Sequence, residues 1–451
     1  MTLYQGTIET LTPEGDGALT DTRGCLVSIP GTLPGENVTY RVEHVSPHDK
    51  RVWASCCEVQ QPSRERRQAP CRVAYPTRGQ CGGCPLMHLS DDLQAELKQK
   101  TVLDALHHAG LNYIRQIEYR RAPAPLGYRN RTDLVAGLVK GRPILGSYEP
   151  RSHQIIITRA CPILRSPIDQ AIEICTNVMQ KMRLPVYQFG KNMKGALRYI
   201  SFFANDAGYL LMDIVTSSEA GQTPAWVKPF ALATKDAFLM IKGISYSLND
   251  SANNAIRVAP SHMLWGEPTL PEHYGTLETR LSASGFTQLN TDMAAIVYSQ
   301  GRDWLGYRPD IVWDLYCGTG CFGRIVAPQK QLYGAEYSAR AIEIAKDVSR
   351  KDDFRTTFEV MNLDQTWPTH WPQPNVILVD PPRKGLSQSV LSHLAQMQNT
   401  DILYMSCNPA SFAKNLAYLD PHYEIAHIAA FDMMPQTRHV EVLALLHSRH
   451  L

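Results

Sequence analysis

The sequence contains no apolar run close to the roughly 20 residues that a membrane-spanning helix requires. Its first ten residues lack the basic stretch followed by an apolar stretch that is typical of a secretion signal. It also lacks a large excess of charge, because the formal net charge at pH 7 is only +2, so a polyanionic partner would have to bind to local basic clusters. We therefore expect a cytoplasmic protein without a membrane partner.

A complete set of disulfide pairs is excluded, because 11 cysteines is an odd number. Cys71, Cys81 and Cys84 lie together in CRVAYPTRGQCGGC, and Cys161 follows in ITRACPIL. The two glycines of CGGC allow both flanking thiolates to face one centre. Four thiolates suit either zinc or an iron–sulfur cluster, and the spacing leaves both open. A redox Cys-x-x-Cys pair is the weaker alternative, because no thioredoxin-like strand precedes this motif.

The chain has no internal repeat, and its 451 residues are too many for a single ordinary domain. Residues 1–60 contain short apolar runs separated by turn residues, which predicts a small β-barrel. Residues 61–275 begin with a polar hinge and the cysteine segment, continue with a helical pattern over 89–110, and then show alternating runs that indicate an antiparallel sheet with helices. Residues 276–451 have a different, α/β pattern.

This last part of the chain has the strand, glycine loop and helix of a doubly wound nucleotide-binding fold. One apolar strand leads into Gly318-Thr319-Gly320, a second ends at Glu336, and a third ends at Asp380. Ligands of such folds bind at the carboxyl ends of the strands, where an acid can accept the ribose hydroxyls. A dehydrogenase would share the Gly-x-Gly loop, but the third glycine used for pyrophosphate is missing. S-adenosylmethionine, which has no phosphate, fits this absence better.

Cys407 directly follows the apolar run DILYM in the stretch SCNPASF. Because Asn408-Pro409 interrupts the strand, we expect the thiol at the same sheet edge as Asp380 and Glu336. A thiolate in that position can act as a nucleophile. A buried structural cysteine is the alternative, and position alone leaves both open.

Six motifs occur in the order and approximate spacing seen in the RNA uracil-5-methyltransferase family, which the chain resembles over nearly its whole length. They are CGGC, GFTQLN (285–290), DLYCGTGCFG, DPPRKGL (380–386), SCNPASFAKNL (406–416) and HVE (439–441). Residues 1–60 also resemble the TRAM domain, an RNA-binding barrel. The resemblance implies a multi-domain α/β protein with an N-terminal OB-like β-barrel (TRAM) over 1–60, a central α+β domain with an iron–sulfur cluster over 61–275, and a C-terminal Rossmann-like methyltransferase domain over 276–451.

The family's chemistry assigns expected roles to matching residues. In the family a thiolate adds to C6 of uracil, C5 takes a methyl group from S-adenosylmethionine, and a base then removes the C5 proton. Cys407 resembles the nucleophile and Glu441 the base, although Glu441 without the family would be read as a surface acid. The residues that resemble the methyl-donor contacts are Gln288, Tyr316, Glu336 and Asp380. Gln288 alone could be any exposed amide, and Tyr316 could simply belong to the core.

The resemblance further implies a structural four-iron, four-sulfur cluster, rather than zinc, on the four cysteines 71, 81, 84 and 161. The gap between Cys71 and Cys81 is longer than is common in the family, and Cys321 stands where an asparagine is usual. The expected partner is RNA, with 23S ribosomal RNA favoured because members with both a TRAM domain and a cluster mostly resemble ribosomal RNA enzymes. Transfer RNA is the alternative substrate, and we expect the chain to act as a monomer.

Two functions from other classes compete with this interpretation. A catalytically silent RNA-binding protein would keep the barrel and the cluster, but the nucleophile, base and donor motifs are intact. A cytosine-5 RNA methyltransferase would carry its own cysteine after the Asp-Pro motif, and DPPRKG has none.

Overall fold

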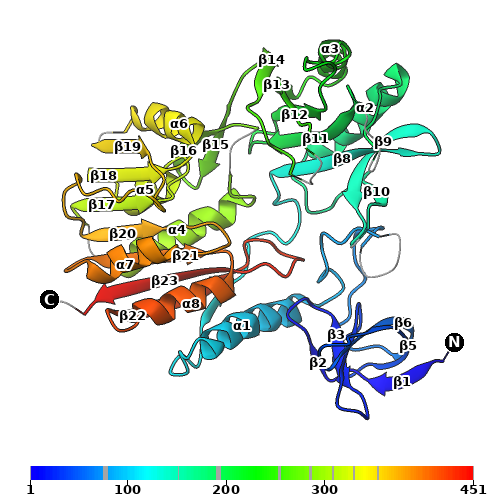
Figure 1. Ribbon diagram of the computed structural model, residues 1–451, viewed down its shortest axis with the longest axis horizontal. Coiled ribbons are helices and arrows are strands. Elements are labelled where there is room, and N and C mark those ends of the chain that lie inside the picture. Colours follow the sequence, from blue (N-terminus) through cyan, green and yellow to red (C-terminus); the bar gives the residue numbers. More distant parts are fainter. Residues whose placement is uncertain are drawn as a thin grey trace.

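The computed structural model describes residues 2–74, 80–150, 152–188, 194–251, 255–283, 287–306, 309–328, 331–352 and 355–449. Three bodies are visible in Figure 1: a small N-terminal sheet in blue, a central sheet in cyan and green, and a C-terminal sheet in yellow to red. Within the described ranges, no helix combines the length and the apolar character needed to cross a membrane.

The N-terminal body is a six-stranded sheet that curls around a small apolar core. Its strands are β1 (Tyr4–Thr7), β2 (Thr10–Leu11), β3 (Gly17–Thr20), β4 (Leu26–Ile29), β5 (Asn37–Val45) and β6 (Arg51–Gln61). One extended segment supplies both edges of the sheet, because β1 pairs with β5 and its continuation β2 pairs with β3. The sheet therefore closes on itself around Ile8, Ile29 and Val38. The predicted series of short strands over 1–60 is confirmed.

The central body is a seven-stranded sheet with order β10-β9-β8-β11-β12-β13-β14. Its elements are β8 (Arg131–Val139), β9 (Arg142–Tyr148), β10 (Ile155–Ile157), α2 (Ile168–Met182), β11 (Leu197–Ala204), β12 (Leu210–Thr216), α3 (Val227–Ala237), β13 (Ile241–Leu248) and β14 (His262–Gly266). Helices α2 and α3 cover one face of the sheet. The predicted antiparallel sheet with helices is confirmed, except that β12 and β13, which α3 joins, run parallel.

The C-terminal body is an eight-stranded sheet with order β19-β18-β17-β20-β21-β23-β22-β7. Its strands are β7 (Glu118–Arg120), β17 (Ile311–Leu315), β18 (Gln331–Glu336), β19 (Thr356–Val360), β20 (Val376–Val379), β21 (Asp401–Ser406), β22 (Tyr423–Phe431) and β23 (Glu441–Ser448). Numbered along the chain from β17, the order is 3-2-1-4-5-7-6, whereas dinucleotide-binding sheets have 3-2-1-4-5-6. The difference is β23, which lies antiparallel between β21 and β22.

Helices cover both faces of this sheet, so the parallel strands are buried on both sides and are largely apolar, as in VILV of β20. One face carries α4 (Thr291–Leu305), α5 (Cys321–Val326) and α6 (Ala339–Ser349). The other face carries α1 (Asp91–His108), α7 (Gln388–Gln396) and α8 (Pro409–Leu419). A hairpin of β15 (Leu270–Tyr274) and β16 (Leu277–Leu281) precedes α4.

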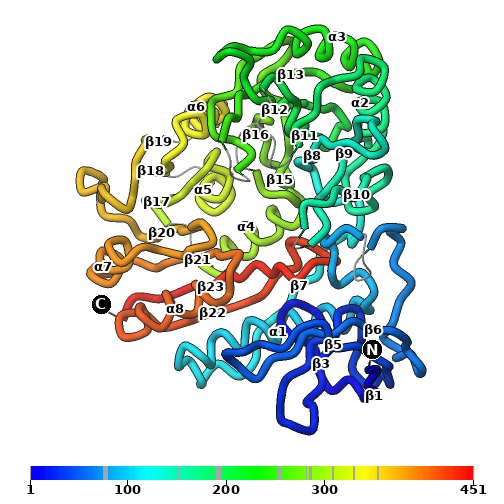
Figure 2. The backbone as a smooth tube through the Cα atoms, turned by 45° about the vertical axis from the view of Figure 1, so that its right-hand side comes forward, coloured from blue at the N-terminus to red at the C-terminus, as the bar shows by residue number. Residues whose placement is uncertain are grey.

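Two elements from the predicted central segment pack on the C-terminal sheet. The predicted helix over 89–110 is confirmed as α1, which Ser90 caps, and it lies beside α8 and β22 in Figure 2. Strand β7 adds to the sheet edge by pairing with β22. The limits of the central and catalytic domains stay predictions, but α1 and β7 are structurally part of the C-terminal body.

Candidate active site at the carboxyl edge of the C-terminal sheet

A cavity of about 700 Å³ lies at the carboxyl ends of the parallel strands. All six residues that the sequence predicted for catalysis or donor binding line it: Gln288, Tyr316, Glu336, Asp380, Cys407 and Glu441. They come from six separate strands or loops. Parallel strands bring their carboxyl ends to one edge, which is why residues so distant in the sequence meet there.

The glycine loop after β17 forms one wall of the cavity. Tyr316, Gly318 and Gly320 have φ angles of 63°, 53° and 78°, in the left-handed region that favours glycine. A Cβ at Gly320 would also lie 2.7 Å from the ring of Phe358. Glu336 accepts hydrogen bonds from the backbone N–H groups of Gly318 at 3.3 Å and of Ser338 at 2.8 Å. The loop therefore holds this carboxylate at the tip of β18.

Asp380 follows β20 and shares a hydrogen bond with Gln288, whose Nε2 donates to its Oδ2 at 3.1 Å. Burial raises the pKa of Asp380 to about 7; the bond from Gln288 opposes this rise, and the charge of Glu336 adds to it. The Asp380 carboxyl therefore changes its charge near neutral pH. Gln288 is half-buried and bonded, so the alternative of an exposed amide was wrong. The neighbouring residues 284–286 of the GFTQLN motif lie outside the described ranges.

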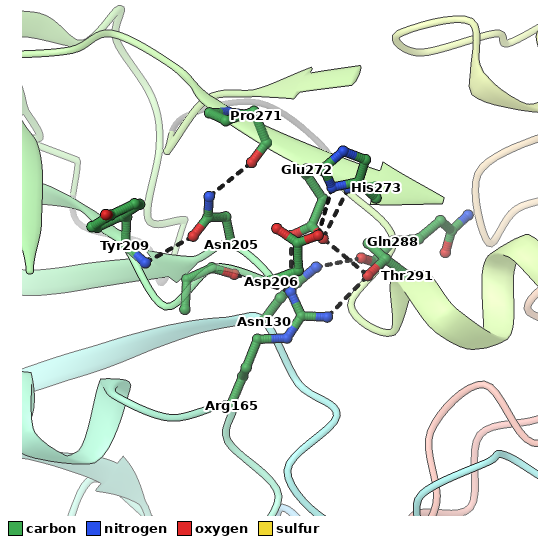
Figure 3. Close-up of polar contacts among 11 residues, drawn as sticks. Asn130, Arg165, Asn205, Asp206, Tyr209, Pro271, Glu272, His273, Gln288 and Thr291 are labelled. Carbon is green, nitrogen blue, oxygen red and sulfur yellow. Dashed lines mark hydrogen bonds and ion pairs between the residues drawn. The ribbon is translucent and has the colours of Figure 1, made fainter. Parts of the chain in front are cut away.

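The central sheet fixes the segment that carries Gln288, as Figure 3 shows. Asn130 donates its Nδ2 to the carbonyl of Gln288 at 2.9 Å. Arg165 donates to Glu272 at 2.9 Å and to the Oγ1 of Thr291 at 3.0 Å. Since Glu272 lies on the hairpin and Thr291 begins α4, these bonds join three elements around the donor side of the cavity.

Cys407 lies in the turn between β21 and α8. The side chain of Asn408 caps α8 by accepting from the N–H of Ala410 at 3.2 Å, and it donates to the carbonyl of Arg383 at 2.8 Å. This bond ties the turn to the DPPRK loop. Cys407 is half-buried and lines the cavity, so the alternative of a cysteine enclosed in the core was wrong. Burial raises the pKa of its thiol to about 12; the charges of Glu441 and Asp380 add to this rise, and Arg383 opposes it.

Glu441 is the first residue of β23 and is 3% exposed, so the alternative of a surface acid was wrong. Its Oε1 has no hydrogen-bond partner in the part of the chain that the structure describes. Burial, and then the charge of Asp380, raises the pKa of this carboxyl well above its usual range. The cavity therefore contains a carboxyl group with an unused oxygen close to the thiol.

The sequence did not identify a further acid in this cavity, Asp314. It lies on β17, is 1% exposed, and accepts through Oδ2 from the N–H of Gly323 at 2.9 Å. Its Oδ1 has no partner among the described residues. Burial raises the pKa of Asp314 to about 8, with the charges of Asp380 and Glu336 adding to the rise. The sequence feature that could have identified Asp314 is an aspartate inside the apolar strand DIVWDL, because an unpaired charge is costly in such a buried position.

Asp314→Asn is expected to make stability less sensitive to pH. In the unfolded chain the carboxyl loses its proton near pH 3.8, whereas in the folded chain it keeps the proton until about pH 8. Stability of the wild type therefore falls as pH rises through this window, by at most about 1.4 kcal/mol per pH unit for this group. Asparagine cannot ionise, so the Tm of the variant, measured by thermal unfolding, should rise relative to the Tm of the wild type between pH 5 and pH 8. A difference in Tm that is independent of pH would contradict this.

The cysteines predicted as metal ligands lie in one region. Cys71, Cys84 and Cys161 pack against an apolar cluster of Met87, Tyr128 and Ile163. Burial raises the pKa of the Cys84 thiol to about 12, and the three other cysteine thiols of the predicted set add to that rise. Within the described ranges, no group of three or more Cys, His, Asp or Glu side chains has the geometry to hold a metal ion. Residues 75–79, in the long gap before CGGC, lie outside those ranges.

Comparison with known proteins shows similarities both in sequence and in structure. The family model described as tRNA (Uracil-5-)-methyltransferase matches residues 369–449. The chain is 31% identical to an uncharacterized RNA methyltransferase of Halalkalibacterium halodurans, over 98% of this chain and 96% of that protein. It is 30% identical to an uncharacterized RNA methyltransferase of Listeria monocytogenes, over the same shares of the two chains, 98% and 96%.

A solved structure has the same fold over the whole chain. The Pyrococcus abyssi tRNA (uracil-54, C5)-methyltransferase, in complex with S-adenosyl-L-homocysteine, superposes with a TM-score of 0.77. The match covers 98% of this chain and 100% of that one, at 24% sequence identity. The arrangement of the three bodies is thus shared with that protein.

Proposed function

This chain belongs to the RNA uracil-5-methyltransferase family and is an enzyme, and on that premise we propose that it methylates C5 of a uridine in RNA with S-adenosylmethionine as donor. The observation that carries the proposal is the lining of one cavity. A thiol, Cys407, and a carboxyl, Glu441, share it with the acids Asp314, Glu336 and Asp380. A nucleophile and a base thus lie beside a pocket that suits a cationic ligand.

The donor side of the cavity fits S-adenosylmethionine, which when bound supplies an electrophilic methyl group on a positively charged sulfur. Glu336 would accept the ribose hydroxyls, as an acid at the tip of the second strand does in related folds. The unpartnered Oδ1 of Asp314 is a suitable acceptor for an ammonium group. A positive ligand also favours the ionised form of buried carboxyls, so it would lower the raised pKa values of Asp314 and Asp380.

The thiolate of Cys407 would add to C6 of the uracil ring, and the electron pair of the C5–C6 double bond would then make C5 nucleophilic. C5 takes the methyl group, and the carbon–sulfur bond of the donor breaks. The ionised carboxylate of Glu441 next removes the C5 proton, the double bond forms again, and the thiolate leaves. Arg383 supports the first step, because its positive charge opposes the raised pKa of the thiol.

RNA must present the uridine out of its stack to reach a half-buried thiol. We propose that the N-terminal barrel is a TRAM-like surface that helps to hold the RNA. Among its basic neighbours, Arg66 is bonded to the buried Glu36 and Arg67 forms an ion pair with Asp91, so these two arginines hold the barrel against the C-terminal body.

We favour 23S ribosomal RNA as the substrate; transfer RNA is the second candidate, supported by the name of the Pyrococcus abyssi relative. The cytoplasmic location and the monomeric state stay predictions.

The experiment that tests this function is mass spectrometry of digested ribosomal and transfer RNA from cells with and without the gene. Loss of a methyl group from uridine in 23S RNA would support both reaction and substrate. Loss in transfer RNA would keep the reaction and exclude the favoured substrate. Unchanged RNA of both kinds would favour a silent RNA-binding protein.

We further propose that Cys71, Cys81, Cys84 and Cys161 hold a structural four-iron, four-sulfur cluster. Support comes from the donor set, since Cys71, Cys84 and Cys161 pack against one apolar cluster of side chains, and thiolates are the ligands that iron–sulfur clusters use. The cluster would fix the segment around Cys81 to the body and take no part in the methyl transfer.

Cys84→Ser is expected to lose most of the iron and sulfide, because it removes one of the four proposed ligands, whereas Cys57→Ser, which changes an exposed cysteine of the barrel, should keep both. Chemical analysis of protein purified without oxygen should give about four iron and four sulfide per chain, the stoichiometry of this cluster type. One zinc and no sulfide would exclude the cluster.

A further inference from the structure

The segment that carries the chain into Glu441 is held largely by residues from the first third of the sequence, with a further hydrogen bond from Asn290 to the carbonyl of Met433. We call residues 432–440, between β22 and β23, the base strap. Six of its nine residues are buried, namely Asp432, Met433, Pro435, Gln436, Thr437 and Val440. Met434 and His439 are half-buried, and Met434 packs against other apolar side chains. Glu441 follows it directly.

A buried ion pair holds the start of the base strap. Lys98 on α1 is 1% exposed, and its Nζ donates to Oδ1 of Asp432 at 2.5 Å and to the carbonyl of Met434 at 3.1 Å. Burial lowers the pKa of Lys98, and the charge of Asp432 opposes that effect. A buried pair of this kind adds little net stability, because both charges lose their hydration. Its clear effect is to fix the geometry of the backbone at this point.

A second contact from α1 holds the middle of the base strap. Gln94 donates its Nε2 to Oε1 of Gln436 at 3.1 Å, and its own Oε1 accepts from the backbone N–H of Gln436 at 3.1 Å. Gln436 has a φ of 68°, which is unfavourable for a residue with a side chain. The two bonds, together with the N–H of Leu86 donating to the Gln436 carbonyl at 3.0 Å, offset that cost.

The cysteine segment touches the same strap. Leu86 is two residues after Cys84, and Tyr128 donates its hydroxyl to the carbonyl of Pro435 at 2.9 Å. Met434 packs in the apolar cluster that also contains the side chains of Cys84 and Cys161. Contacts therefore hold the base strap on two sides, from α1 and from the region of the predicted metal ligands.

The backbone of Glu441 pairs with Phe431 of β22, but its side chain has no comparable support. Its Oε1 lacks a partner among the described residues, and its neighbour Val442 forms the last rung between β23 and β21. The position of the carboxyl group must therefore be set through the backbone on either side of it. On one side that backbone is β23, and on the other it is the base strap.

We propose that Lys98 and Gln94 are positioning residues for the base Glu441, acting through the base strap; this rests on the function proposed above. A loosened strap would leave the carboxylate poorly aimed at the C5 proton, while Cys407 and the donor side keep their own supports. Addition of the thiolate and transfer of the methyl group would proceed. Removal of the C5 proton, re-formation of the C5–C6 double bond and departure of the thiolate would become slow, so the methylated RNA would stay attached to Cys407.

The test follows one turnover of the full-length protein with S-adenosylmethionine and a substrate RNA. Lys98→Met and Gln94→Leu remove the two contacts, and the matched control is Lys100→Met, which removes an exposed lysine of the same helix that pairs with Asp104. A denaturing gel measures the covalent protein–RNA adduct, and labelled methyl measures transfer. Both strap variants should release the adduct at least about tenfold more slowly than the wild type, with first-turnover methyl transfer changed less than about threefold; the control should release it at the wild-type rate.

Glu441→Gln, assayed in the same experiment, distinguishes a failure of the proposed chemistry from a failure of the proposed role of the base strap. If it accumulates no adduct, the proposed chemistry fails; if it does accumulate the adduct and Gln94→Leu releases RNA as fast as the wild type, the role of the strap fails. Equal slowing of transfer and release would also overturn that role, because it indicates general damage. Gln94→Leu decides the outcome if Lys98→Met does not fold, since it removes only neutral hydrogen bonds, two with Gln436 and one to the carbonyl of Leu89, and leaves the ion pair intact.

Discussion

Cys407→Ala is expected to abolish turnover, with a loss on the order of 10⁴-fold or more, as is found when a covalent nucleophile is removed. The thiol lines the cavity beside Glu441 and Asp380, and the part of the chain that surrounds the cavity offers no second thiol in the same turn. Without addition at C6, C5 of uracil remains a poor nucleophile, so the donor stays unused. Transfer of labelled methyl to RNA measures the loss.

The control for this prediction is Cys57→Ala, which changes an exposed thiol of the barrel. It should transfer methyl groups at the wild-type rate. Binding of S-adenosylmethionine to Cys407→Ala, measured by calorimetry, should be retained, because Gln288 keeps its hydrogen bond to Asp380 and Glu336 keeps the one from the backbone of Gly318. A Cys407→Ala protein with full activity would exclude the covalent mechanism.

Glu441→Gln is expected to convert the enzyme into one that traps its RNA. The amide cannot accept the C5 proton, yet it fills the same buried space, so thiolate addition and methyl transfer remain possible. The pKa of Cys407 should also fall, since the charge of Glu441 is among the causes that raise it. Multiple turnover should drop by about 10²- to 10⁴-fold, the usual range for loss of a general base, while one equivalent of methylated RNA accumulates on the protein in a denaturing gel.

Glu424→Gln is the matched control, because Glu424 is an exposed glutamate on the neighbouring strand β22. It should turn over normally and leave no adduct. Glu441→Gln with normal turnover, or with no turnover and no adduct, would remove Glu441 from the role of base.

The sequence was sufficient for those features that depend on local pattern. Apolar runs of strand length followed by glycine or proline located β17, β18, β20 and β21, and parallel strands leave their carboxyl ends at one edge. That rule is enough to expect Glu336, Asp380 and Cys407 in one cavity. Asn408-Pro409 also predicted the end of β21, and the structure adds its reason, since Asn408 caps the following helix.

Features that depend on packing between distant segments were not predictable. Lys98 and Asp432 are 334 positions apart, and Gln94 and Gln436 are 342 apart. Nothing local distinguishes these side chains from solvated ones. Strand β7 has only three residues and therefore no periodic signal, so its place in the C-terminal sheet, like the burial of Glu441, appears only when the chain is folded.

The most direct test of the central claim uses RNA that carries tritium at C5 of its uridines. The purified protein is incubated with this RNA and with S-adenosylmethionine bearing a carbon-labelled methyl group, and both labels are counted. Methylation at C5 replaces the C5 hydrogen, so the account predicts one tritium released to water for each methyl group incorporated, and neither event with Cys407→Ala. Methyl incorporation without tritium release would show that another atom of the RNA is the acceptor and would contradict the account.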